Sequence, residues 1–460
     1  MAIQKLLIAN RGEIAVRIIR AAQELGIATV QVHSAADADS LAVKMADEAV
    51  NIGPPMASKS YLNIANILKA AADTGADAVH PGYGFLAENA DFADAVEAAG
   101  LVWVGPKGSA IRVMGDKVAA RVAAQSAGVP VVPGSDGRID DPDQARALAL
   151  KIGFPVMIKA AAGGGGRGIR IAQDIEEFDR LLPQASAEAK AAFGDGGLYM
   201  EKVIERARHI EVQILGDGTD VIHCFERECS LQRRRQKVWE EAPSAALPQA
   251  MRDQLCASAV ALAKAVQYRG AGTLEYLYDD ASGAFYFIEM NTRIQVEHPV
   301  TEMITGIDLV REMLRIAGGQ PLRYKQAEVR LTGHAIEVRI CAEDPAQGFK
   351  PGPGTISTLK VPGGPGVRFD TLLYQGYTVP PFYDSLLGKL IVWDETRAQA
   401  IARMARALGE LEVGGLPTTK PLHQALARDA EVQAGQFHTR WLEPWLDQNA
   451  DRLGEETKTP

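Results

Sequence analysis

The sequence predicts an α/β fold, α+β in part, that begins with a doubly wound parallel sheet and continues into a mixed α/β domain. Three observations support this class. Short apolar segments alternate with segments of helical spacing through residues 4–104, which is the pattern of β-α-β units. A hairpin signal, Gly216-Asp217-Gly218, follows between two segments that alternate apolar and polar residues. The 460 residues are enough for several domains rather than one.

Each element of the first domain follows from its own pattern. In the first helix, Ile14, Ile18, Ala21 and Leu25 recur at helical spacing, and Gly26 ends it. Short apolar runs between such helices predict buried strands. We therefore expect strands at 4–9, 27–33, 76–80 and 101–104, and helices at 12–25, 60–74 and 86–99.

The rest of the chain divides where the pattern changes. A helical linker containing Gly115-Asp116-Lys117 leads to a small unit with a glycine-rich loop, then to a large strand-rich piece and a polar tail expected to be frayed. Strands are expected at 155–159, 169–172, 198–203, 209–215, 221–228, 272–278, 284–290 and 334–341, and helices near 142–152, 175–192, 396–408 and 418–428. The predicted divisions are 1–104, 105–130, 131–203, 204–447 and 448–460.

Residues 288–299, IEMNTRIQVEHP, form the segment around which we expect the site to be built. An apolar run leads into polar side chains at every second position, namely Glu289, Asn291, Arg293, Gln295 and Glu297. In an extended segment, residues two apart point to the same face. A solvated strand face needs neither so apolar an approach nor both charge signs. The oxygens of Glu289 and Asn291 suit Mg²⁺, Arg293 suits a small oxyanion, and Glu297 is a candidate base.

A glycine-rich loop, Lys159-Ala-Ala-Ala-Gly-Gly-Gly-Gly-Arg-Gly168, follows a predicted strand. Glycine lets backbone N–H groups approach phosphate oxygens closely, and the lysine can neutralise a phosphate. The spacing is neither GxxxxGK[ST] nor GxGxxG, so P-loop and Rossmann sites are not favoured. A plain surface hairpin does not need four consecutive glycines.

Two further segments hold candidate binding residues. In Ser230-Leu-Gln-Arg-Arg-Arg-Gln-Lys-Val-Trp-Glu-Glu241, four cations fall within five positions of a chain whose net charge is −9. Lys237 and one of the arginines would neutralise phosphate or bicarbonate there. Glu201-Lys202-Val203-Ile204 ends a strand beside a hinge and could offer apolar walls and backbone groups to an adenine, although a strand end is its default interpretation.

Two strand residues complete the candidates. Glu275 could pair with Glu289 on the next strand, where the two carboxylates would repel each other unless a cation lay between them. For Arg339, in the alternating segment 334–341, a structural ion pair and a functional role are equally open.

Composition excludes some partners. The net charge of −9 argues against nucleic acid or an acidic membrane bound over a broad basic surface. The four cysteines have neither CxxC nor zinc spacing, which predicts reduced thiols in a cytoplasmic protein, with Cys229 beside the basic run as the one that could be reactive. The amino end has no targeting character, and no apolar run reaches membrane-spanning length.

Taken together, these segments resemble the ATP-grasp superfamily and, more narrowly, biotin carboxylase, the ATP-dependent component of biotin-dependent carboxylases such as acetyl-CoA or acyl-CoA carboxylase. The resemblance covers nearly the whole chain. It rests on IANRGEIAVRIIRA near the amino end, HPGYGFLAEN at 80–89, MGDK at 114–117, the glycine loop, QRR-x-QKV-x-EEAP at 232–243 and EMNTRIQVEHPVTE at 289–302. The last two motifs are highly specific.

The resemblance implies an ATP-grasp fold with an amino-terminal domain, a mobile ATP lid and a carboxyl-terminal domain around one active site. It assigns ATP, with its metal, to Lys117, Lys159, Gly165, Gly166, Glu201, Lys202, Val203, Ile204, His209, Gln232, Arg235, Glu275 and Glu289. It assigns Mg²⁺ or Mn²⁺ to Glu275, Glu289 and Asn291. Bicarbonate falls to Lys237, Arg293 and the backbone of Val296 with Glu297 as base, and biotin to Arg339, Tyr83 and Gln295.

The implied reaction is carboxylation of biotin at N1′. Glu297 removes the bicarbonate proton, bicarbonate attacks the γ-phosphorus of ATP, and the resulting carboxyphosphate breaks to CO₂ and phosphate. Phosphate takes the N1′ proton, Arg339 stabilises the enolate, and N1′ attacks CO₂. The sequence shows no Met-Lys-Met biotinyl site and no carboxyltransferase region after residue 445, which predicts a separate biotin carboxyl carrier protein and a carboxyltransferase subunit.

Three features depart from the family pattern. Arg235 stands where histidine is usual, which predicts altered nucleotide affinity with activity retained, because arginine can contact phosphate but cannot shuttle a proton. Ala161 and Ala162 replace a serine and a glycine of the lid loop and predict a stiffer lid. Pro365 replaces an aromatic residue at the family's dimer contact. A homodimer is still expected, because the charged residues of that contact are retained: Arg20, Glu24 and Arg368.

Two other functions stay open at this point. Another ATP-grasp ligase, joining a different carboxylate to an amine, fits the lid loop and metal carboxylates equally well but is disfavoured by QRR-x-QKV and RIQVEHP. A non-catalytic ATP-binding assembly subunit is suggested by Arg235 and the lid alanines. The acceptor of the complete carboxylase is also open among acetyl-CoA, other acyl-CoAs, 2-oxo acids and urea-type acceptors.

Overall fold

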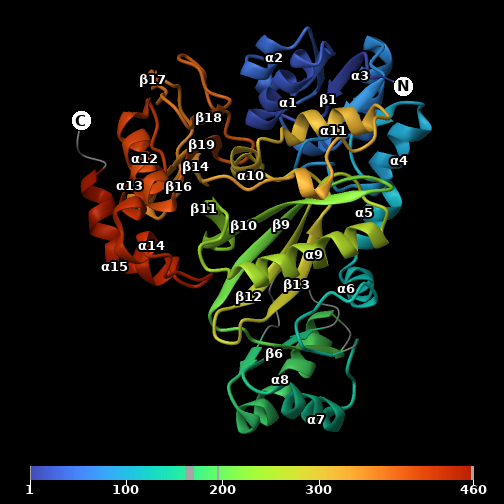
Figure 1. Cartoon of the computed structure of the whole chain (residues 1–460), viewed down its shortest axis with the longest axis vertical. Coiled ribbons are helices and arrows are strands. Elements are labelled where there is room, and N and C mark those ends of the chain that lie inside the picture. Colours follow the sequence, from blue (N-terminus) through green and yellow to red (C-terminus); the bar gives the residue numbers. More distant parts are fainter. Residues whose placement is uncertain (1, 136, 161–169, 194–195, 457–460) are drawn as a thin grey trace.

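The computed structural model describes residues 2–135, 137–160, 170–193 and 196–456. Its body contains two large sheets, and a smaller unit with its own sheet projects from the body (Figure 1). Figure 1 shows the amino-terminal part and the carboxyl-terminal helices on opposite upper sides of the body, with the projecting unit below.

The amino-terminal sheet is parallel, with the strand order β3-β2-β1-β4-β5. Leu6 and Ile8 of β1 pack with α1, whereas Leu7 packs with α3 and α4. Because strand side chains alternate between faces, helices cover both faces, which confirms the doubly wound arrangement. The elements are β1 (Lys5–Ile8), α1 (Gly12–Glu24), β2 (Ala28–Ser34), α2 (Leu41–Met45), β3 (Glu48–Gly53), α3 (Ile64–Thr74), β4 (Ala78–His80), α4 (Ala90–Ala98) and β5 (Val102–Trp103).

The helical linker is two helices rather than one. α5 (Gly108–Gly115) ends and α6 (Lys117–Ser126) begins around Asp116, whose backbone is extended. The Asp116 side chain accepts a 2.8 Å hydrogen bond from Ala119 N–H. An aspartate in this position caps the following helix, so it starts a new helix instead of continuing the old one.

The projecting unit consists of α7, β6, β7, α8 and β8, and its antiparallel sheet has the order β7-β6-β8. Phe178 of α8 packs on Val156, Ile158 and Met200 of the sheet. The predicted elements are confirmed as α7 (Pro142–Ile152), β6 (Val156–Ala160), β7 (Arg170–Ala172), α8 (Ile175–Phe193) and β8 (Leu198–Lys202).

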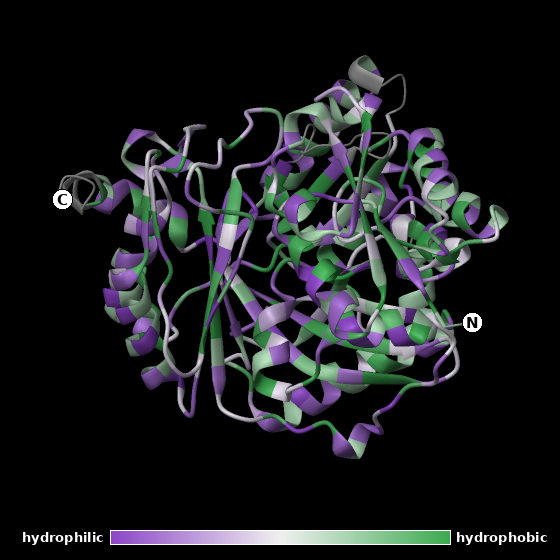
Figure 2. Cartoon of the chain, turned by 90° about the horizontal axis from the view of Figure 1, so that it is seen from above, coloured by the Kyte–Doolittle hydropathy of each residue, from purple (hydrophilic) through white to green (hydrophobic). Residues whose placement is uncertain are grey.

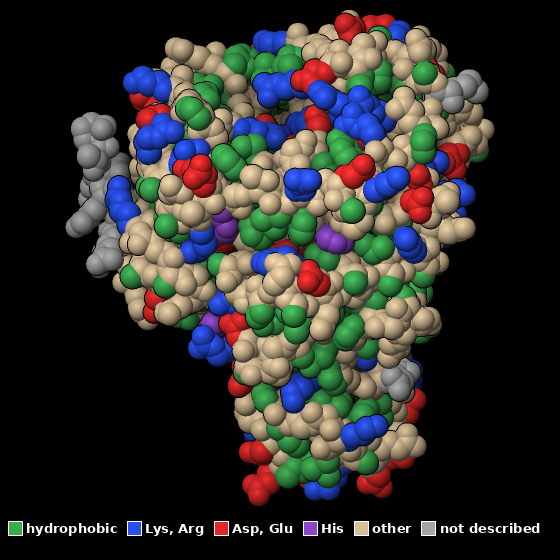
Figure 3. Space-filling model, in the orientation of Figure 1, with side chains coloured by type: hydrophobic (Ala, Val, Ile, Leu, Met, Phe, Trp, Pro, Cys, Tyr) green, Lys and Arg blue, Asp and Glu red, His purple; other side chains and the backbone are tan. Residues whose placement is uncertain are grey.

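The two segments that join the projecting unit to the body are hydrogen bonded to each other. Gly134 forms an antiparallel bridge with Glu201, and Lys202 N–H donates to Pro133 O at 2.8 Å. The incoming segment is also tied to the body, because Phe287 N–H donates to Pro130 O at 2.7 Å. The unit is therefore attached through one paired ribbon, and Figure 3 shows it as a narrower extension below a broad body.

The second large sheet is antiparallel, with the order β13-β12-β9-β10-β11-β14-β19-β18. The predicted hairpin is confirmed, since Val221 pairs with Gly216. β11 was not predicted as a strand, because its polar and charged residues hide the pattern. The strands are β9 (Ala207–Asp217), β10 (Val221–Arg233), β11 (Gln236–Ala242), β12 (Arg269–Asp279), β13 (Phe285–Asn291), β14 (His334–Cys341), β18 (Val367–Thr371) and β19 (Leu386–Asp394).

Helices and two short strand pairs lie around this sheet, and the helices carry both hydrophilic and hydrophobic residues (Figure 2). The prediction of a frayed tail from residue 448 is wrong as far as Glu456, because that stretch continues α15 and buries Leu453 in a hydrophobic cluster. The helices are α9 (Gln249–Ala265), α10 (His298–Thr305), α11 (Leu309–Ala317), α12 (Arg397–Glu410), α13 (Lys420–Arg428), α14 (Ala430–Gln433) and α15 (Leu442–Glu456). The short pairs are β15 (Glu343–Asp344) with β16 (Lys350–Pro351) and β17 (Thr358–Lys360) with β20 (Glu412–Gly414).

Within the described residues, no helix combines the length and the apolar character needed to cross a bilayer.

Candidate active site

Two carboxylates face each other on the last two strands of the antiparallel sheet. Glu275 on β12 is paired directly with Glu289 on β13, which confirms the pairing inferred from the sequence. Burial and the charge of Glu275 raise the pKa of Glu289, so these carboxylates repel each other. Asn291 Nδ2 donates a 2.9 Å hydrogen bond to Glu275 Oε1. Opposed oxygens of this kind suit a hard divalent cation.

The alternation predicted for residues 289–297 holds only as far as Asn291. β13 ends there, and Glu297 already occupies the N-cap position of α10. The chain leaves the sheet where Thr292 N–H donates to Glu88 Oε1 at 3.0 Å. The polar side chains of this segment are therefore brought together by a turn and not along one extended face.

Lys237 on β11 is the centre of the charge cluster. Its Nζ donates to Glu211 Oε2 at 2.6 Å, to Glu275 Oε1 at 2.9 Å and to Glu297 Oε1 at 2.6 Å. Burial opposes its charge, but the three carboxylates outweigh burial and hold the pKa of Lys237 well above its ordinary value. Burial likewise raises the pKa of Glu275, but Lys237 and His209 outweigh it, and the pKa of Glu275 is well below normal.

Glu297 is held between two cations. Its Oε1 accepts from Lys237, and its Oε2 accepts from Arg339 Nη2 at 3.0 Å. Burial opposes ionisation, yet Lys237, Arg339 and Arg227 lower the pKa of Glu297 far below its ordinary range. Arg339 Nε also donates to Glu240 Oε1 at 2.6 Å, and burial raises the pKa of Glu240 to about 7. Arg339 therefore joins the base to a second buried carboxyl group.

Arg293 lies on the metal side of the cluster. Its Nε donates to Glu88 Oε2 at 2.9 Å, and its Nη2 donates to Asn291 Oδ1 at 3.0 Å. Glu88 lies just before α4, so this contact connects the amino-terminal domain with the turn that follows β13. An anion that binds Arg293 has to share it with Glu88.

Gln295 is turned into the protein. Its Nε2 donates to Glu275 Oε1 at 2.8 Å, and its Oε1 accepts from Arg227 Nη2 at 2.9 Å. This placement differs from the biotin-facing position that the resemblance implies, because the amide braces Glu275 instead. Arg227 itself is fully buried and ties together five side chains: Glu211, Gln213, Thr273, Gln295 and Thr301.

The proposed ATP residues divide between the projecting unit and the body. Across β6 and β8, Lys159 forms an ion pair with Glu201. Lys202 Nζ lies 3.4 Å from Ile152 O, and the buried residues Val203 and Ile204 follow β8. Residues 161–169 lie outside the described residues and include Ala161, Ala162, Gly165 and Gly166. The phosphate-binding role of the loop and its stiffness therefore stay predictions.

On the body, His209 joins the cluster, with Nε2 at 3.1 Å from Glu275 Oε2 and Nδ1 at 3.1 Å from Gln232 Nε2. Lys117 begins α6, and its charge lowers the pKa of Glu289, although burial raises that pKa more. Lys117 therefore acts electrostatically on one of the opposed carboxylates.

Arg235 lies at the exposed tip of the β10–β11 hairpin. Arg233 pairs with Gln236, so Arg234 and Arg235 form a two-residue turn with φ of 48° and 66°. Residues other than glycine, asparagine and aspartate are uncommon in this left-handed region. Arg235 is exposed at this turn.

The carboxylates here suggest two possible cation sites. Ligand atoms of His209, Glu211 and Glu275 lie within 4.8 Å of one another, as do those of Glu211, Cys229 and Glu297. Lys237 Nζ already occupies the centre of these groups, within 2.9 Å of each glutamate. Glu289, opposite Glu275, forms no ion pair within the described residues, so the pair Glu275 and Glu289 fits a metal better.

The environment of Cys229, the cysteine beside the basic run, does not make its thiol reactive. Cys229 is buried, and burial together with the charges of Glu211 and Glu297 raises the pKa of its thiol well above the ordinary value. A thiol in this environment stays protonated and is a poor nucleophile.

Four contact residues of the cluster were missed from the sequence: Glu88, Glu211, Arg227 and Glu240. Glu88 and Glu240 lie inside the motifs HPGYGFLAEN and QRR-x-QKV-x-EEAP, and Glu211 follows His209 by two positions in an alternating strand, so each carried a signal. Arg227 lies in a segment read only as a strand, and its role depends on contacts between distant strands.

Family profiles match most of the chain. They are described as "Biotin carboxylase, N-terminal domain" over residues 2–111, "Carbamoyl-phosphate synthase L chain, ATP binding domain" over 116–325 and "Biotin carboxylase C-terminal domain" over 337–444. The biotin carboxylase of Nostoc sp. is 55% identical over 444 residues, which are 96% of this chain and 99% of that protein. Biotin carboxylase 1 of Bacillus subtilis is 53% identical over 444 residues, again 96% of this chain and 99% of that protein.

A solved structure agrees. The biotin carboxylase domain dimer of Hydrogenobacter thermophilus 2-oxoglutarate carboxylase, in complex with MgADP, ADP and bicarbonate, has a TM-score of 0.86 and 48% identity, covering 98% of this chain and 99% of that chain.

The fold, with a paired-ribbon unit set against a sheet that carries opposed carboxylates, defines an ATP-grasp ligase. Within that class the chain belongs to the biotin carboxylase family. It is an ATP-dependent enzyme that carboxylates biotin, and it uses ATP, Mg²⁺ and carrier-borne biotin.

Proposed function

We propose that bicarbonate binds beside Lys237, Arg293 and the main-chain N–H of Val296, with Glu297 as its general base. One observation carries this proposal: Lys237 Nζ, firmly charged, lies 2.6 Å from Glu297 Oε1. An anion entering between them meets charge-assisted donors on one side and a carboxylate able to take its proton on the other.

Glu297 becomes an effective base when its cations change partners. While Lys237 and Arg339 both donate to it, its pKa is far below normal and its affinity for a proton is small. A bicarbonate ion that accepts hydrogen bonds from Lys237 removes part of this stabilisation, so the pKa of Glu297 rises. Proton removal therefore follows bicarbonate binding and does not precede it.

The projecting unit acts as the ATP lid. We assign the nucleotide to Lys159, Glu201, Lys202, Val203 and Ile204 on the lid side and to Lys117, His209, Gln232 and Arg235 on the body side. Mg²⁺ is assigned to Glu275, Glu289 and Asn291, and when bound it neutralises the phosphates and orients the γ-phosphoryl group. The glycine loop, with Gly165 and Gly166, stays a prediction for the phosphates.

Biotin is assigned to Arg339 and Tyr83, and Gln295 supports the site by bracing Glu275. Arg339 Nη2 turns from Glu297 toward the ureido oxygen, while Nε stays bound to Glu240. The second contact keeps the guanidinium in place during the exchange, so that it is ready to stabilise the enolate oxygen.

With these assignments the reaction has three steps. Bicarbonate, deprotonated by Glu297, attacks the γ-phosphorus, and ADP leaves as carboxyphosphate forms. Carboxyphosphate breaks into CO₂ and phosphate, and phosphate removes the N1′ proton of biotin. N1′ then attacks CO₂ while Arg339 stabilises the enolate oxygen, and the closed lid excludes water from the labile intermediate.

Two partners are proposed for the enzyme, a separate biotin carboxyl carrier protein and a carboxyltransferase subunit. The carboxyltransferase chooses the acceptor. We assign the enzyme to the cytoplasm, which agrees with four free cysteines.

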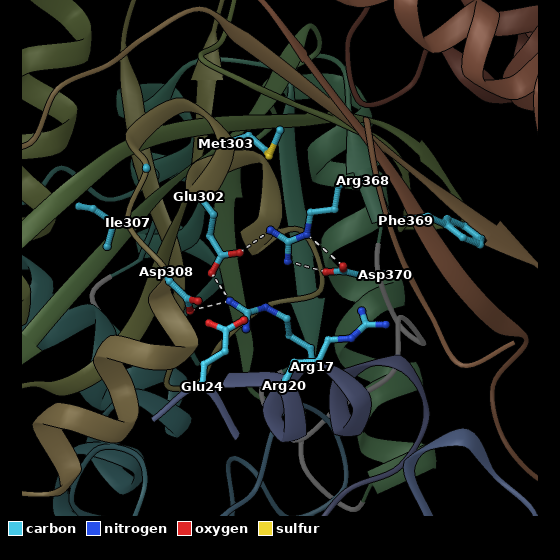
Figure 4. Close-up of a pocket in the computed structure, with 11 residues that line it drawn as sticks. Arg17, Arg20, Glu24, Glu302, Met303, Ile307, Asp308, Arg368, Phe369 and Asp370 are labelled. Atoms are coloured by element: carbon cyan, nitrogen blue, oxygen red, sulfur yellow. Dashed lines mark hydrogen bonds and ion pairs between the residues drawn. The ribbon is translucent and has the colours of Figure 1, made fainter. Parts of the chain in front are cut away.

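We also propose a homodimer through the face that holds Arg20, Glu24 and Arg368. These residues line one pocket of about 400 Å³ bordered by α1, α10 and β18 (Figure 4). Arg368 is fixed there by Glu302 at 2.7 Å and Asp370 at 2.6 Å. Analytical ultracentrifugation at micromolar concentration should show a dimer that Arg20→Glu dissociates, and a wild-type protein found only as monomer refutes the proposal.

The catalytic assignment is tested by ATP hydrolysis with and without bicarbonate and free biotin. We expect phosphate release to depend on bicarbonate and to be stimulated by biotin. ATP turnover that ignores bicarbonate and biotin but requires an amino acid would point to another ATP-grasp ligase. ATP binding without bicarbonate-dependent turnover would point to a non-catalytic subunit.

A further inference from the structure

Two buried charges that the proposed reaction does not use connect its biotin side with its bicarbonate side. Lys389 on β19 is 0% exposed and Glu13, in the first turn of α1, is 2% exposed. Lys389 Nζ lies 3.1 Å from Glu13 Oε2. A buried ion pair recovers its desolvation cost only when further hydrogen bonds satisfy both partners. Here each partner has one such bond, and each bond leads to a proposed substrate contact.

The Glu13 end holds Tyr83. Glu13 Oε1 accepts a hydrogen bond from the Tyr83 hydroxyl, while the Tyr83 carbonyl accepts one from Asn10 Nδ2 at 2.7 Å. The loop after β4 is thus fixed at the backbone by Asn10 and at the ring end by Glu13. Without Glu13, the tyrosine ring keeps its backbone anchor but loses its orientation.

The Lys389 end holds the turn before α10. Lys389 Nζ donates to Val296 O at 2.8 Å. This carbonyl belongs to the peptide that joins Val296 to Glu297, so the bond fixes the turn that presents both the Val296 N–H and the proposed base. Lys389 itself is held rigidly, because it is paired in register with Arg339 on β14.

The other acids around Lys389 do not explain its burial. Asp370, opposite Lys389 on β18, is already paired with Arg368 at 2.6 Å. Glu337 is fully buried, and neither of its carboxylate oxygens has a hydrogen-bond partner among the described residues. Within the described residues, the ion pair that Lys389 forms is the one with Glu13, at 3.1 Å.

We infer that Glu13 and Lys389 are positioning residues that align Tyr83 for biotin and the Val296–Glu297 turn for bicarbonate, through one buried bridge between the amino-terminal domain and the antiparallel sheet. This inference rests on the roles proposed above for Tyr83 and Val296. Neither member of the bridge meets a substrate, so its loss changes the KM for two substrates and leaves the nucleotide site alone.

Steady-state kinetics of the full-length enzyme test the bridge. Lys389→Met should raise the KM for bicarbonate and for free biotin by about tenfold, the effect of one charge-assisted hydrogen bond, with the KM for ATP unchanged. Arg252→Met is the matched control, because it also removes a mostly buried cation from a carboxylate, Glu226 at 2.7 Å, away from the site. We expect Arg252→Met to lower the melting temperature without changing any KM.

The double variant Glu13→Met with Lys389→Met separates positioning from stability, because methionine removes both the charge and the oxygen that accepts the Tyr83 hydroxyl. It leaves no unpaired buried charge, so the melting temperature should recover relative to Lys389→Met, while both KM values stay raised. If the KM values return to those of the wild type together with the melting temperature, the bridge is only structural and the inference is overturned. A rise of all three KM values in parallel overturns it as well.

Tyr83→Phe separates the biotin role of Tyr83 from the bridge that positions it. It should raise the KM for biotin, and combining it with Glu13→Met should add little, because both remove the hydrogen bond between the Tyr83 hydroxyl and residue 13. If Tyr83→Phe leaves the KM for biotin unchanged, Tyr83 has no role in biotin binding. The inference that Glu13 positions Tyr83 for biotin is then rejected as well. A wild-type enzyme without bicarbonate-dependent turnover instead rejects the assigned reaction before any variant is compared.

Discussion

Replacing Lys237 by methionine removes a cation that forms ion pairs with Glu211, Glu275 and Glu297. Its Nζ lies within 2.9 Å of all three carboxylates, and only 12% of the side chain is exposed. Removing one partner of a buried ion pair costs about 3–5 kcal/mol, since the other charge is left uncompensated. We expect the free energy of unfolding to fall by that amount near neutral pH and bicarbonate-dependent ATP hydrolysis to be lost, while ATP still binds.

The stability loss in this variant should depend on pH. In the wild type, the pKa values of Glu275 and Glu297 are lowered below the ordinary 4.5, so both carboxylates contribute stability that is complete above that pH and is lost only as the pH falls through the folded values. Without Lys237, burial dominates for Glu275 and raises its pKa instead. The free energy of unfolding of the variant is then reduced most at high pH, and the reduction becomes smaller as Glu275 takes up a proton.

Thermal unfolding at about pH 8 and about pH 5.5 measures this difference, with Arg252→Met as the control for loss of a mostly buried cation. The gap in melting temperature between wild type and Lys237→Met should narrow at the lower pH. An equal gap at both values, or an unchanged KM for bicarbonate in the variant, refutes the reasoning that Lys237 is the shared counter-ion and an anion donor.

Three further predictions follow from single contacts. Arg235→His should change the KM for ATP with turnover retained, and an unchanged KM for ATP shows that the Arg235 side chain does not reach the nucleotide. Glu88→Gln weakens the hold on Arg293 and should alter the KM for bicarbonate by about tenfold or less, whereas a change in the KM for biotin alone contradicts the bicarbonate role of Arg293. Cys229 should resist thiol-alkylating reagents in the folded enzyme, as judged by mass spectrometry, because its raised pKa keeps it protonated; rapid labelling at neutral pH contradicts its burial.

Much of the fold could be predicted because local pattern and burial agree there. β1, α1 and the β9–β10 hairpin each carry an apolar period or a glycine turn that matches their final environment. β3 could not be found, because it is a largely exposed edge strand without an apolar run. The end of α15 was missed for the opposite reason, since the burial of Leu453 comes from a core formed by distant elements.

The candidate site was predicted residue by residue but not contact by contact. The motif at 289–302 named the acids and the arginine, and the pairing of Glu275 with Glu289 followed from strand alternation. The partner of Arg293 could not be named, because Glu88 is 205 positions away in the sequence. The inward turn of Gln295 depends on Arg227, whose other hydrogen-bond partners come from β9, β12 and α10 and leave no local trace in the sequence.

The paired ribbon that attaches the projecting unit limits how that unit can move. Gly134 and Glu201 are bridged, and Lys202 N–H bonds to Pro133 O, so the entering and leaving segments bend together. Two strands locked side by side resist twisting and sliding, which leaves bending about one line as the soft motion. If the unit is the proposed lid, closure would follow a single arc and would bring Lys159 and Glu201 to the same place over the body each time. Inserting a residue in one of the two joining segments disrupts the pairing of Gly134 with Glu201 unless the other segment is lengthened by the same amount.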